Sequence, residues 1–185
     1  MKTANNVGRP RSVAGLQKLA GLWPAYEVWL TLIERGMVMQ PEFNNLKVGL
    51  RGEAKVKVTA DNVAPAFGSG EVDVFATPAL VALVEAAAQD AIKGCLPPGW
   101  TTVGMEIKLK HFAPSPPGME VVGKAVLEDI VGRRLVFSVR AYDESEQVSS
   151  GQHHRFIVNM VKFKEQAQAK KKERMEDEKA SLVSD

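Results

Sequence analysis

The stretch Thr77–Lys93, TPALVALVEAAAQDAIK, is the strongest helix signal in the sequence and decides the expected fold. Thr77 and Pro78 form a typical helix start, an N-cap followed by a proline in the first turn, and a glycine after the stretch supplies a stop. Glu85 and Asp90 are its only acids. A helix that is apolar nearly all round belongs in an interior. We therefore predict a buried helix that is wrapped by a sheet.

Strands are expected on both sides of this helix in the sequence. Upstream, Lys47–Thr59 ends in a clean apolar–polar alternation, which is typical of a half-buried strand. Downstream, four more strands are expected, at Thr101–Phe112, Met119–Val131, Arg134–Asp143 and Gln147–Val161. Their connections have hairpin length, so neighbouring strands should be antiparallel. The predicted fold class is α+β, an antiparallel sheet of about five strands around one long central helix.

The 185 residues suit one globular domain with extensions. We expect a basic leader and amphipathic helical extension at 1–45, the domain at 46–163, and a charged, flexible or helical tail at 164–185. The leader has no acidic residue before Glu27, a composition typical of an organelle transit peptide. The expected location is therefore the cytoplasm, or an organelle matrix if the leader is a transit peptide.

Composition and motifs argue against several function classes. The net charge of +2 gives no overall basic field for nucleic acid. The one cysteine, Cys95, excludes an internal disulfide framework and a Cys-rich zinc site. No apolar run reaches the ~18 residues that span a bilayer. A P-loop and a G-x-S-x-G elbow are both absent. His153 and His154 should point to opposite faces of a strand, so we expect no metal site.

Three polar residues remain as candidates for chemistry: Thr77, Glu85 and His111. Glu85 has apolar neighbours all along its helix, and burying a carboxylate is costly unless it is paired or protonated. Each residue also has a simpler explanation. Thr77 can be a helix cap, Glu85 a surface glutamate and His111 a strand-end histidine. The residues alone leave these alternatives open.

Three segments carry a family resemblance. They are VFATPALVALVEAAA at 74–88, TTVGMEIKLKHFAPSPPGMEVVGKAVLEDIVGRRLVFSVRAYDE at 101–144, and GQHHRFIVN at 151–159. Over Leu50–Phe163 the chain resembles the hot-dog thioesterases of the fluoroacetyl-CoA thioesterase-like family. The resemblance implies a hot-dog fold and a homodimer formed edge to edge, which would also cover the exposed edge of a five-stranded sheet.

The resemblance also implies site residues. The catalytic threonine, glutamate and histidine of the family fall on Thr77, Glu85 and His111, and its substrate-contacting glycine falls on Gly104. One position departs from the pattern, because Glu71 stands where the fluoroacetyl-specific enzyme has an aromatic gate. Selectivity for a fluoroacetyl group is therefore not expected from the resemblance.

The expected function is hydrolysis of a short or small acyl-CoA thioester to the free acid and coenzyme A. No cofactor is expected, since coenzyme A enters as part of the substrate. Glu85 would act as general base or as attacking carboxylate, His111 as proton shuttle, and Thr77 as the group that positions the carbonyl or Glu85. Two alternatives remain open: a non-catalytic acyl-CoA-binding hot-dog module, and a hot-dog enoyl-CoA hydratase. The hydratase pattern, Asp or Asn followed five residues later by His, is absent after Asp61 and Asn62.

Overall fold

The structure is a computed structural model that describes residues 42–183, without the side chains of 172, 173 and 175–183. The basic leader and most of the helical extension predicted before residue 46 lie outside the described residues. Within the described part, the predicted helix is present as α2 (Thr77–Ala91). The strands are β1 (Arg51–Lys57), β2 (Trp100–His111), β3 (Glu120–Val131), β4 (Arg134–Tyr142) and β5 (Gln147–Asn159).

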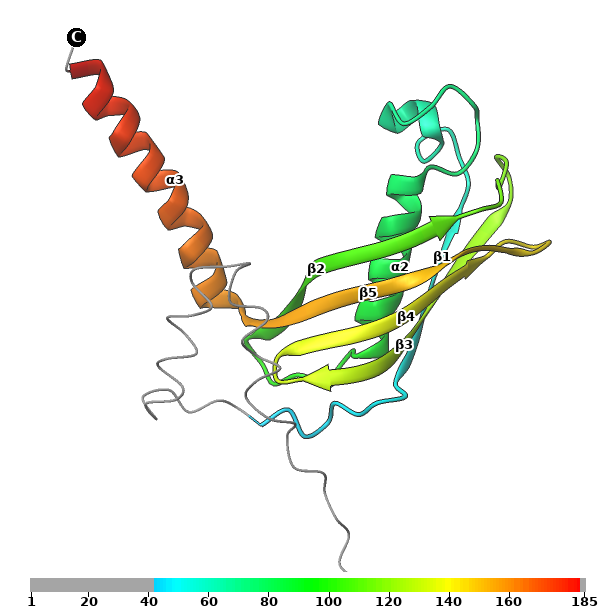
Figure 1. The fold of residues 1–185 in the computed structure, drawn as a ribbon, viewed down its shortest axis with the longest axis horizontal. Coiled ribbons are helices and arrows are strands. Elements are labelled where there is room, and N and C mark those ends of the chain that lie inside the picture. Colours follow the sequence, from blue (N-terminus) through cyan, green and yellow to red (C-terminus); the bar gives the residue numbers. More distant parts are fainter. Residues whose placement is uncertain (1–41, 184–185) are drawn as a thin grey trace, which may run out of the picture. The chain divides into compact units, whose positions relative to one another are not determined.

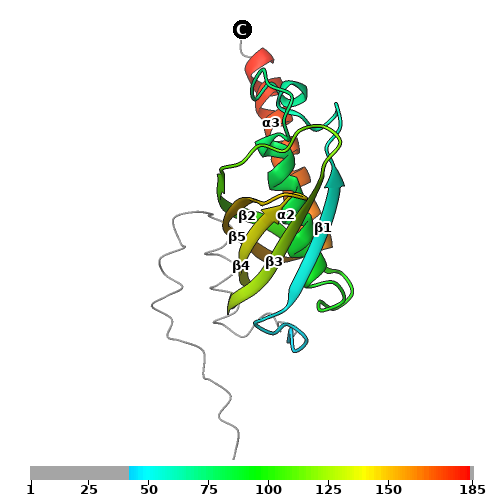
Figure 2. The same ribbon diagram turned by 90° about the vertical axis from the view of Figure 1, so that its right-hand side faces the viewer.

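The five strands form one sheet in the order β1-β3-β4-β5-β2, and every neighbouring pair is antiparallel. The helix α2 lies across one face of this sheet (Figures 1 and 2). A short 3-10 helix, η3 (Ala64–Phe67), lies in the connection between β1 and α2. The α+β class and the hot-dog arrangement predicted from the sequence are confirmed, and each predicted strand is present with ends that differ by a few residues.

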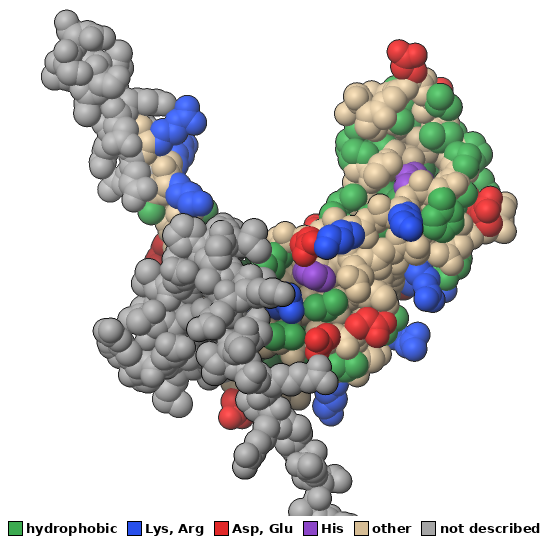
Figure 3. Space-filling model, viewed as in Figure 1, with side chains coloured by type: hydrophobic (Ala, Val, Ile, Leu, Met, Phe, Trp, Pro, Cys, Tyr) green, Lys and Arg blue, Asp and Glu red, His purple; other side chains and the backbone are tan. Residues whose placement is uncertain are grey.

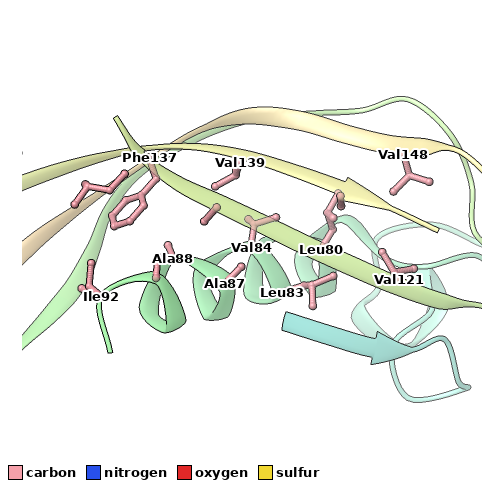
Figure 4. Packing of buried hydrophobic residues seen from close by; sticks show 14 of the residues in the cluster. Leu80, Leu83, Val84, Ala87, Ala88, Ile92, Val121, Phe137, Val139 and Val148 are labelled. Carbon is pink, nitrogen blue, oxygen red and sulfur yellow. The ribbon is translucent and has the colours of Figure 1, made fainter. Parts of the chain in front are cut away.

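The core forms between α2 and the sheet. Figure 4 shows side chains of α2 packed against side chains of the strands, among them Leu80, Val84, Ala88, Val121, Phe137, Val139 and Val148. The opposite side of α2 is open, because Ala82 and Ala86 are exposed. The prediction of a helix buried all round is therefore wrong for the single chain. The sheet covers one side of the helix, and alanine is small enough to be tolerated on the other.

A glycine sets how closely β1 approaches α2. A Cβ atom at Gly52 would overlap the backbone of Ala87 and Ala91 on the helix. The backbone of β1 can therefore lie directly on the C-terminal half of α2. The peptide N–H of Glu53 also donates a hydrogen bond of 3.0 Å to the Asp90 carboxylate. These contacts attach the edge strand to the helix as well as to β3.

A bulge in β2 changes which side chains face α2. The pairing of β2 with β5 shifts register between Gly104 and Glu106. Such a bulge inserts one extra residue and reverses the in–out alternation beyond it. Thr102 and Gly104 before the bulge and His111 after it consequently share the face that carries α2. A strand with unbroken alternation would send Gly104 and His111 to opposite faces.

The chain continues from β5 directly into α3 (Met160–Val183). Its described side chains are exposed except that of Phe163, which is half-buried. On the face of the described residues that Figure 3 shows, charged side chains of both signs are interspersed. The surface ion pairs include Lys108–Glu106 at 2.8 Å and Lys55–Glu53 at 3.5 Å. This mixed surface agrees with the small net charge of the sequence.

Candidate active site

Thr77 and His111 meet at the N-terminal end of α2. The Oγ1 atom of Thr77 lies 3.0 Å from Nδ1 of His111, the last residue of β2. The N-cap of α2 is Ala76, without a side-chain cap, so the prediction that Thr77 caps the helix is wrong by one residue. Thr77 occupies the first helical position, from which its hydroxyl points to the strand. The hydroxyl is thus free of a capping role and joins the histidine.

Burial affects the chemistry of His111. Removal from water lowers the pKa of the His111 imidazole below its ordinary value of 6.5, because burial disfavours the charged form. The nearby Ala113 carbonyl opposes this effect, although it makes no hydrogen bond with Nε2. The neutral imidazole is therefore favoured at neutral pH. A neutral imidazole beside a hydroxyl is the arrangement that can accept the hydroxyl proton.

Glu85 lies two turns further along α2 and contacts Gly104. A Cβ atom at Gly104 would overlap the Glu85 carboxylate where it now lies, so the glycine leaves room for the carboxylate at this point of β2. The Glu85 side chain is 37% exposed. In the single chain the Glu85 carboxylate is therefore half-buried, between the buried position and the surface position that the sequence left open. The structure places the Glu85 carboxylate beside Gly104.

A buried polar cluster on β5 and β2 faces Glu85, and sequence reasoning missed it. Arg155 is 2% exposed and donates hydrogen bonds to Thr102 Oγ1 at 2.8 Å and to the Thr102 carbonyl at 3.0 Å. Its Nη1 atom lies 3.9 Å from Glu85 Oε2 and 3.1 Å from His153 Nε2. A guanidinium is always charged and has no acceptor. Arg155 therefore places a permanent positive charge beside the Glu85 carboxylate.

His153 supports Arg155 in its neutral form. Its Nδ1 lies 3.0 Å from the Glu106 carbonyl, which can only accept, so Nδ1 carries the hydrogen. Nε2 is then free to accept from Arg155. Burial lowers the pKa of His153, which favours the same neutral state. The sequence contained one signal for this cluster. His153 and Arg155 are two residues apart on one strand, so their side chains share a face of the sheet.

Within one chain, the candidate residues form two groups. Thr77 and His111 make one, and Glu85 makes the other with Gly104, His153 and Arg155. Glu85 follows Thr77 by eight residues, which is about 12 Å along a helix. The structure therefore does not join Glu85 to His111 in a single chain. The joint action of Glu85 as general base and His111 as proton shuttle, which the family resemblance implies, stays a prediction that requires a second chain.

Among residues 42–183 there is neither a metal-binding cluster nor a membrane-spanning helix. No group of three or more His, Cys, Asp or Glu side chains in this range is placed to hold a metal ion. No helix in the same range is long and apolar enough to cross a membrane.

Comparison with known proteins gives a family match that spans most of the sheet and α2. The family described as fluoroacetyl-CoA-specific thioesterase matches residues 58–161, more than half of the chain. The chain belongs to this family. A curated relative, the fluoroacetyl-CoA thioesterase of Streptantibioticus cattleyicolor, is 38% identical over 91 residues. The matched region is 49% of this chain and 66% of that relative, so just under two thirds of the relative is spanned.

Solved structures give the same family and fold. A structure of the fluoroacetyl-CoA thioesterase matches with a TM-score of 0.63 and 30% identity, over 68% of this chain and 97% of that one. A Thermus thermophilus protein described as a thioesterase superfamily member matches with a TM-score of 0.65 and 28% identity, over 75% of this chain and 99% of that one. A hot-dog-like protein from Thermanaerovibrio acidaminovorans matches with a TM-score of 0.64 and 21% identity, over 70% of this chain and 97% of that one. At this identity the match supports the fold alone. The family and the hot-dog fold expected from the sequence are confirmed.

Proposed function

We propose that this protein hydrolyses the thioester of a small acyl-CoA, releasing the free acid and coenzyme A. Membership of the fluoroacetyl-CoA-specific thioesterase family supports the reaction class. The observation that carries the proposal is the 3.0 Å contact between Thr77 Oγ1 and His111 Nδ1 at the start of a helix. A hydroxyl beside a neutral imidazole is suited to acyl transfer, and a helix start is suited to an oxyanion.

The helix start supplies donors for the thioester oxygen. The peptide N–H groups of the first turn have no intrahelical acceptor. Pro78 has no N–H, and the N–H of Ala76 is bonded to the Asn62 carbonyl. Thr77 and Ala79 are thus the first-turn residues whose N–H groups can donate to an oxyanion. The negative charge that develops on the carbonyl oxygen is stabilised there by the helix dipole as well.

In the route that this geometry favours, Thr77 is the nucleophile. His111 Nδ1 takes the hydroxyl proton as Oγ1 attacks the carbonyl carbon, and the carbon–sulfur bond then breaks. The imidazolium returns the proton to the departing coenzyme A thiolate. Water, activated by His111 in the same way, then hydrolyses the threonine ester and restores the enzyme.

A second route uses Glu85, which lies at Gly104, the position expected to contact substrate. Here the carboxylate activates water or attacks the thioester itself, and Arg155 holds the carboxylate in place. Thr77→Ser and Thr77→Ala separate the routes. A threonine nucleophile tolerates serine, loses turnover with alanine and gives a trappable acyl-threonine ester. The Glu85 route instead loses about 10²–10⁴-fold in rate with Glu85→Gln, as expected for a lost general base.

We also propose that the working form is a homodimer. β2 is an edge of the sheet, and its outer side carries unpaired peptide groups that a second β2 can pair with. Such pairing would place Glu85 and the open side of α2 near the partner. Sedimentation equilibrium at micromolar concentration should give twice the chain mass of 20.2 kDa. A mass of one chain would remove the dimer from the proposal.

The proposal is tested by thiol release from a panel of acyl-CoA substrates of increasing acyl length. We expect turnover of the small members, with fluoroacetyl-CoA included to test selectivity, since Glu71 departs from the family's aromatic gate. A non-catalytic acyl-CoA-binding module would bind members of the panel without releasing thiol. A hydratase would instead consume the double bond of an enoyl-CoA. Absence of thiol release from every member would contradict the proposed function.

A further inference from the structure

Two buried polar atoms belong to residues that are directly paired across β2 and β5, His111 and Ser149. His111 on β2 is directly paired with Ser149 on β5, so the two side chains stand on the same face of the sheet. Ser149 is 0% exposed. Among the described residues, neither Ser149 Oγ nor His111 Nε2 has a hydrogen-bond partner, and both atoms are buried. Unpartnered buried groups of this kind are rare and call for an explanation.

The fold itself does not require a hydroxyl at Ser149. On β4, the residue directly paired with Ser149 is Ala141, which is also fully buried, so a small apolar side chain suits this part of the core. A second buried serine gives the contrast. Ser115 is also 0% exposed, but its hydroxyl donates to Asp143 Oδ2 at 2.7 Å. Ser115 therefore has a structural bond to make, whereas Ser149 keeps a buried hydroxyl at a cost to stability.

We infer that Ser149 is a positioning residue for His111, with its hydroxyl serving the Nε2 side of the imidazole directly or through one water. When the Thr77 hydroxyl donates to Nδ1, the hydrogen of the neutral ring is on Nε2 and points to an acceptor. Ser149 Oγ can be that acceptor. After the ring has taken the Thr77 proton, both nitrogens are donors, and the same hydroxyl stabilises the imidazolium.

This role fits the charge around His111. Among the described residues, the contacts of the ring are Thr77 from α2 and the carbonyl of Ala113, and no acidic or basic side chain is paired with it. Within the single chain, therefore, no carboxylate orients the ring as one does in a serine protease triad. A neutral hydroxyl can fix the tautomer of His111 while leaving the ring uncharged at rest. The inference rests on the proposed thioester hydrolysis.

The test compares Ser149→Ala with two control variants. Ser150→Ala removes the neighbouring hydroxyl on the opposite face of β5 and should match the wild type in turnover and melting temperature. Ser115→Ala should lower the melting temperature, because it removes the hydrogen bond from the Ser115 hydroxyl to Asp143 Oδ2. Ser149→Ala should fold with an unchanged or higher melting temperature, since it removes an unpartnered hydroxyl. Its kcat should nevertheless fall about 10- to 100-fold, the value of a hydrogen bond to a charged group, with little change in KM.

Two readouts show whether Ser149 acts through His111. Ser149→Ala should move the acid limb of the kcat profile to lower pH, because the imidazolium loses an acceptor. In a His111→Ala background, Ser149→Ala should cost almost nothing, because the two residues act as a unit. An unchanged kcat and pH profile in Ser149→Ala, or an equal loss of rate in both backgrounds, would overturn the inference.

A further measurement separates this inference from the proposed function. The sequence has only three histidines, so the His111 imidazole can be followed by NMR titration without substrate. Ser149→Ala should lower the pKa of His111 relative to wild type, and Ser150→Ala should not. If wild type releases no thiol, the proposed hydrolysis fails, and the titration still decides whether Ser149 serves His111. An unshifted His111 titration would contradict the positioning role.

Discussion

At the scale of single residues, Thr77 shows how a one-residue shift changes a role. An N-cap contributes roughly 0.5–2 kcal/mol to protein stability, and a capping role alone would have been a sufficient reason for a threonine at this position. The cap position is Ala76, and the Thr77 hydroxyl instead contacts His111. Thr77→Ala should therefore lose turnover with a melting temperature within about 2 °C of wild type, because it removes no cap. Thermal denaturation beside thiol release checks this. A large loss of stability would restore the capping explanation.

Histidine burial gives a pH dependence at the same scale. Burial lowers the pKa of both His111 and His153 below 6.5 in the folded chain. The unfolded chain then takes up protons first as pH falls, so this contribution to stability is complete above about pH 6.5 and is lost below it. The free energy of unfolding should therefore be lower at pH 5.5 than at pH 7.5. Urea denaturation at both values measures this difference.

A control variant assigns the effect to the buried histidine. His153→Gln keeps a donor for the Glu106 carbonyl and an acceptor for Arg155, but it does not titrate. Its stability should change less between pH 7.5 and pH 5.5 than that of wild type. An equal change in both proteins would show that His153 does not contribute to it.

The residues of the candidate site could be predicted only where a family motif identified them. Thr77, Glu85, His111 and Gly104 were reached through the family resemblance, and the structure places Thr77 with His111 and Glu85 with Gly104. Arg155 was missed. An arginine in a strand is ordinarily exposed, and the burial of Arg155 depends on the hydrogen bonds that it donates to Thr102, which lies 53 residues away in the sequence. Such partners become visible only once the strand register is known.

At the scale of elements, periodicity and turn residues predicted α2 and all five strands. What they could not predict is the bulge at Gly104–Glu106, because one extra residue is invisible in a pattern of short alternations. The bulge decides that Gly104 and His111 share the face of α2. The open side of α2 was missed for a related reason, since alanine at 82 and 86 is compatible with both a buried and an exposed face.

The contact between β1 and α2 gives a prediction about packing. Gly52→Ala should be destabilising, because the added Cβ would overlap helix backbone atoms that cannot rotate away. A cost of about 1–3 kcal/mol is typical of overpacking, which is roughly 2–4 °C in melting temperature per kcal/mol for a chain of this size. Glu53→Ala, at an exposed neighbour, is the control and should change little. Equal melting temperatures for Gly52→Ala and wild type would contradict the close packing.

At the scale of the whole molecule, the tail adds little to the core. The tail from 164 begins within α3, and its described side chains are exposed. A chain that ends after Lys164 keeps Phe163 and should retain the melting temperature and turnover of the full chain, because few apolar contacts are removed. The melting temperature and the turnover of the truncated chain are measured beside those of the full chain under the same conditions. A marked loss of either would mean that the tail docks on the domain or on a partner chain.

The central claim is that the Thr77–His111 pair hydrolyses an acyl-CoA thioester. The most direct measurement is thiol release from the best small acyl-CoA by wild type and by His111→Ala, with circular dichroism and sedimentation to confirm an unchanged fold and assembly. The account predicts steady turnover by wild type and a loss of about 10²–10⁴-fold in kcat for the variant, as expected when a general base is removed. A folded His111→Ala variant with wild-type turnover would contradict the account.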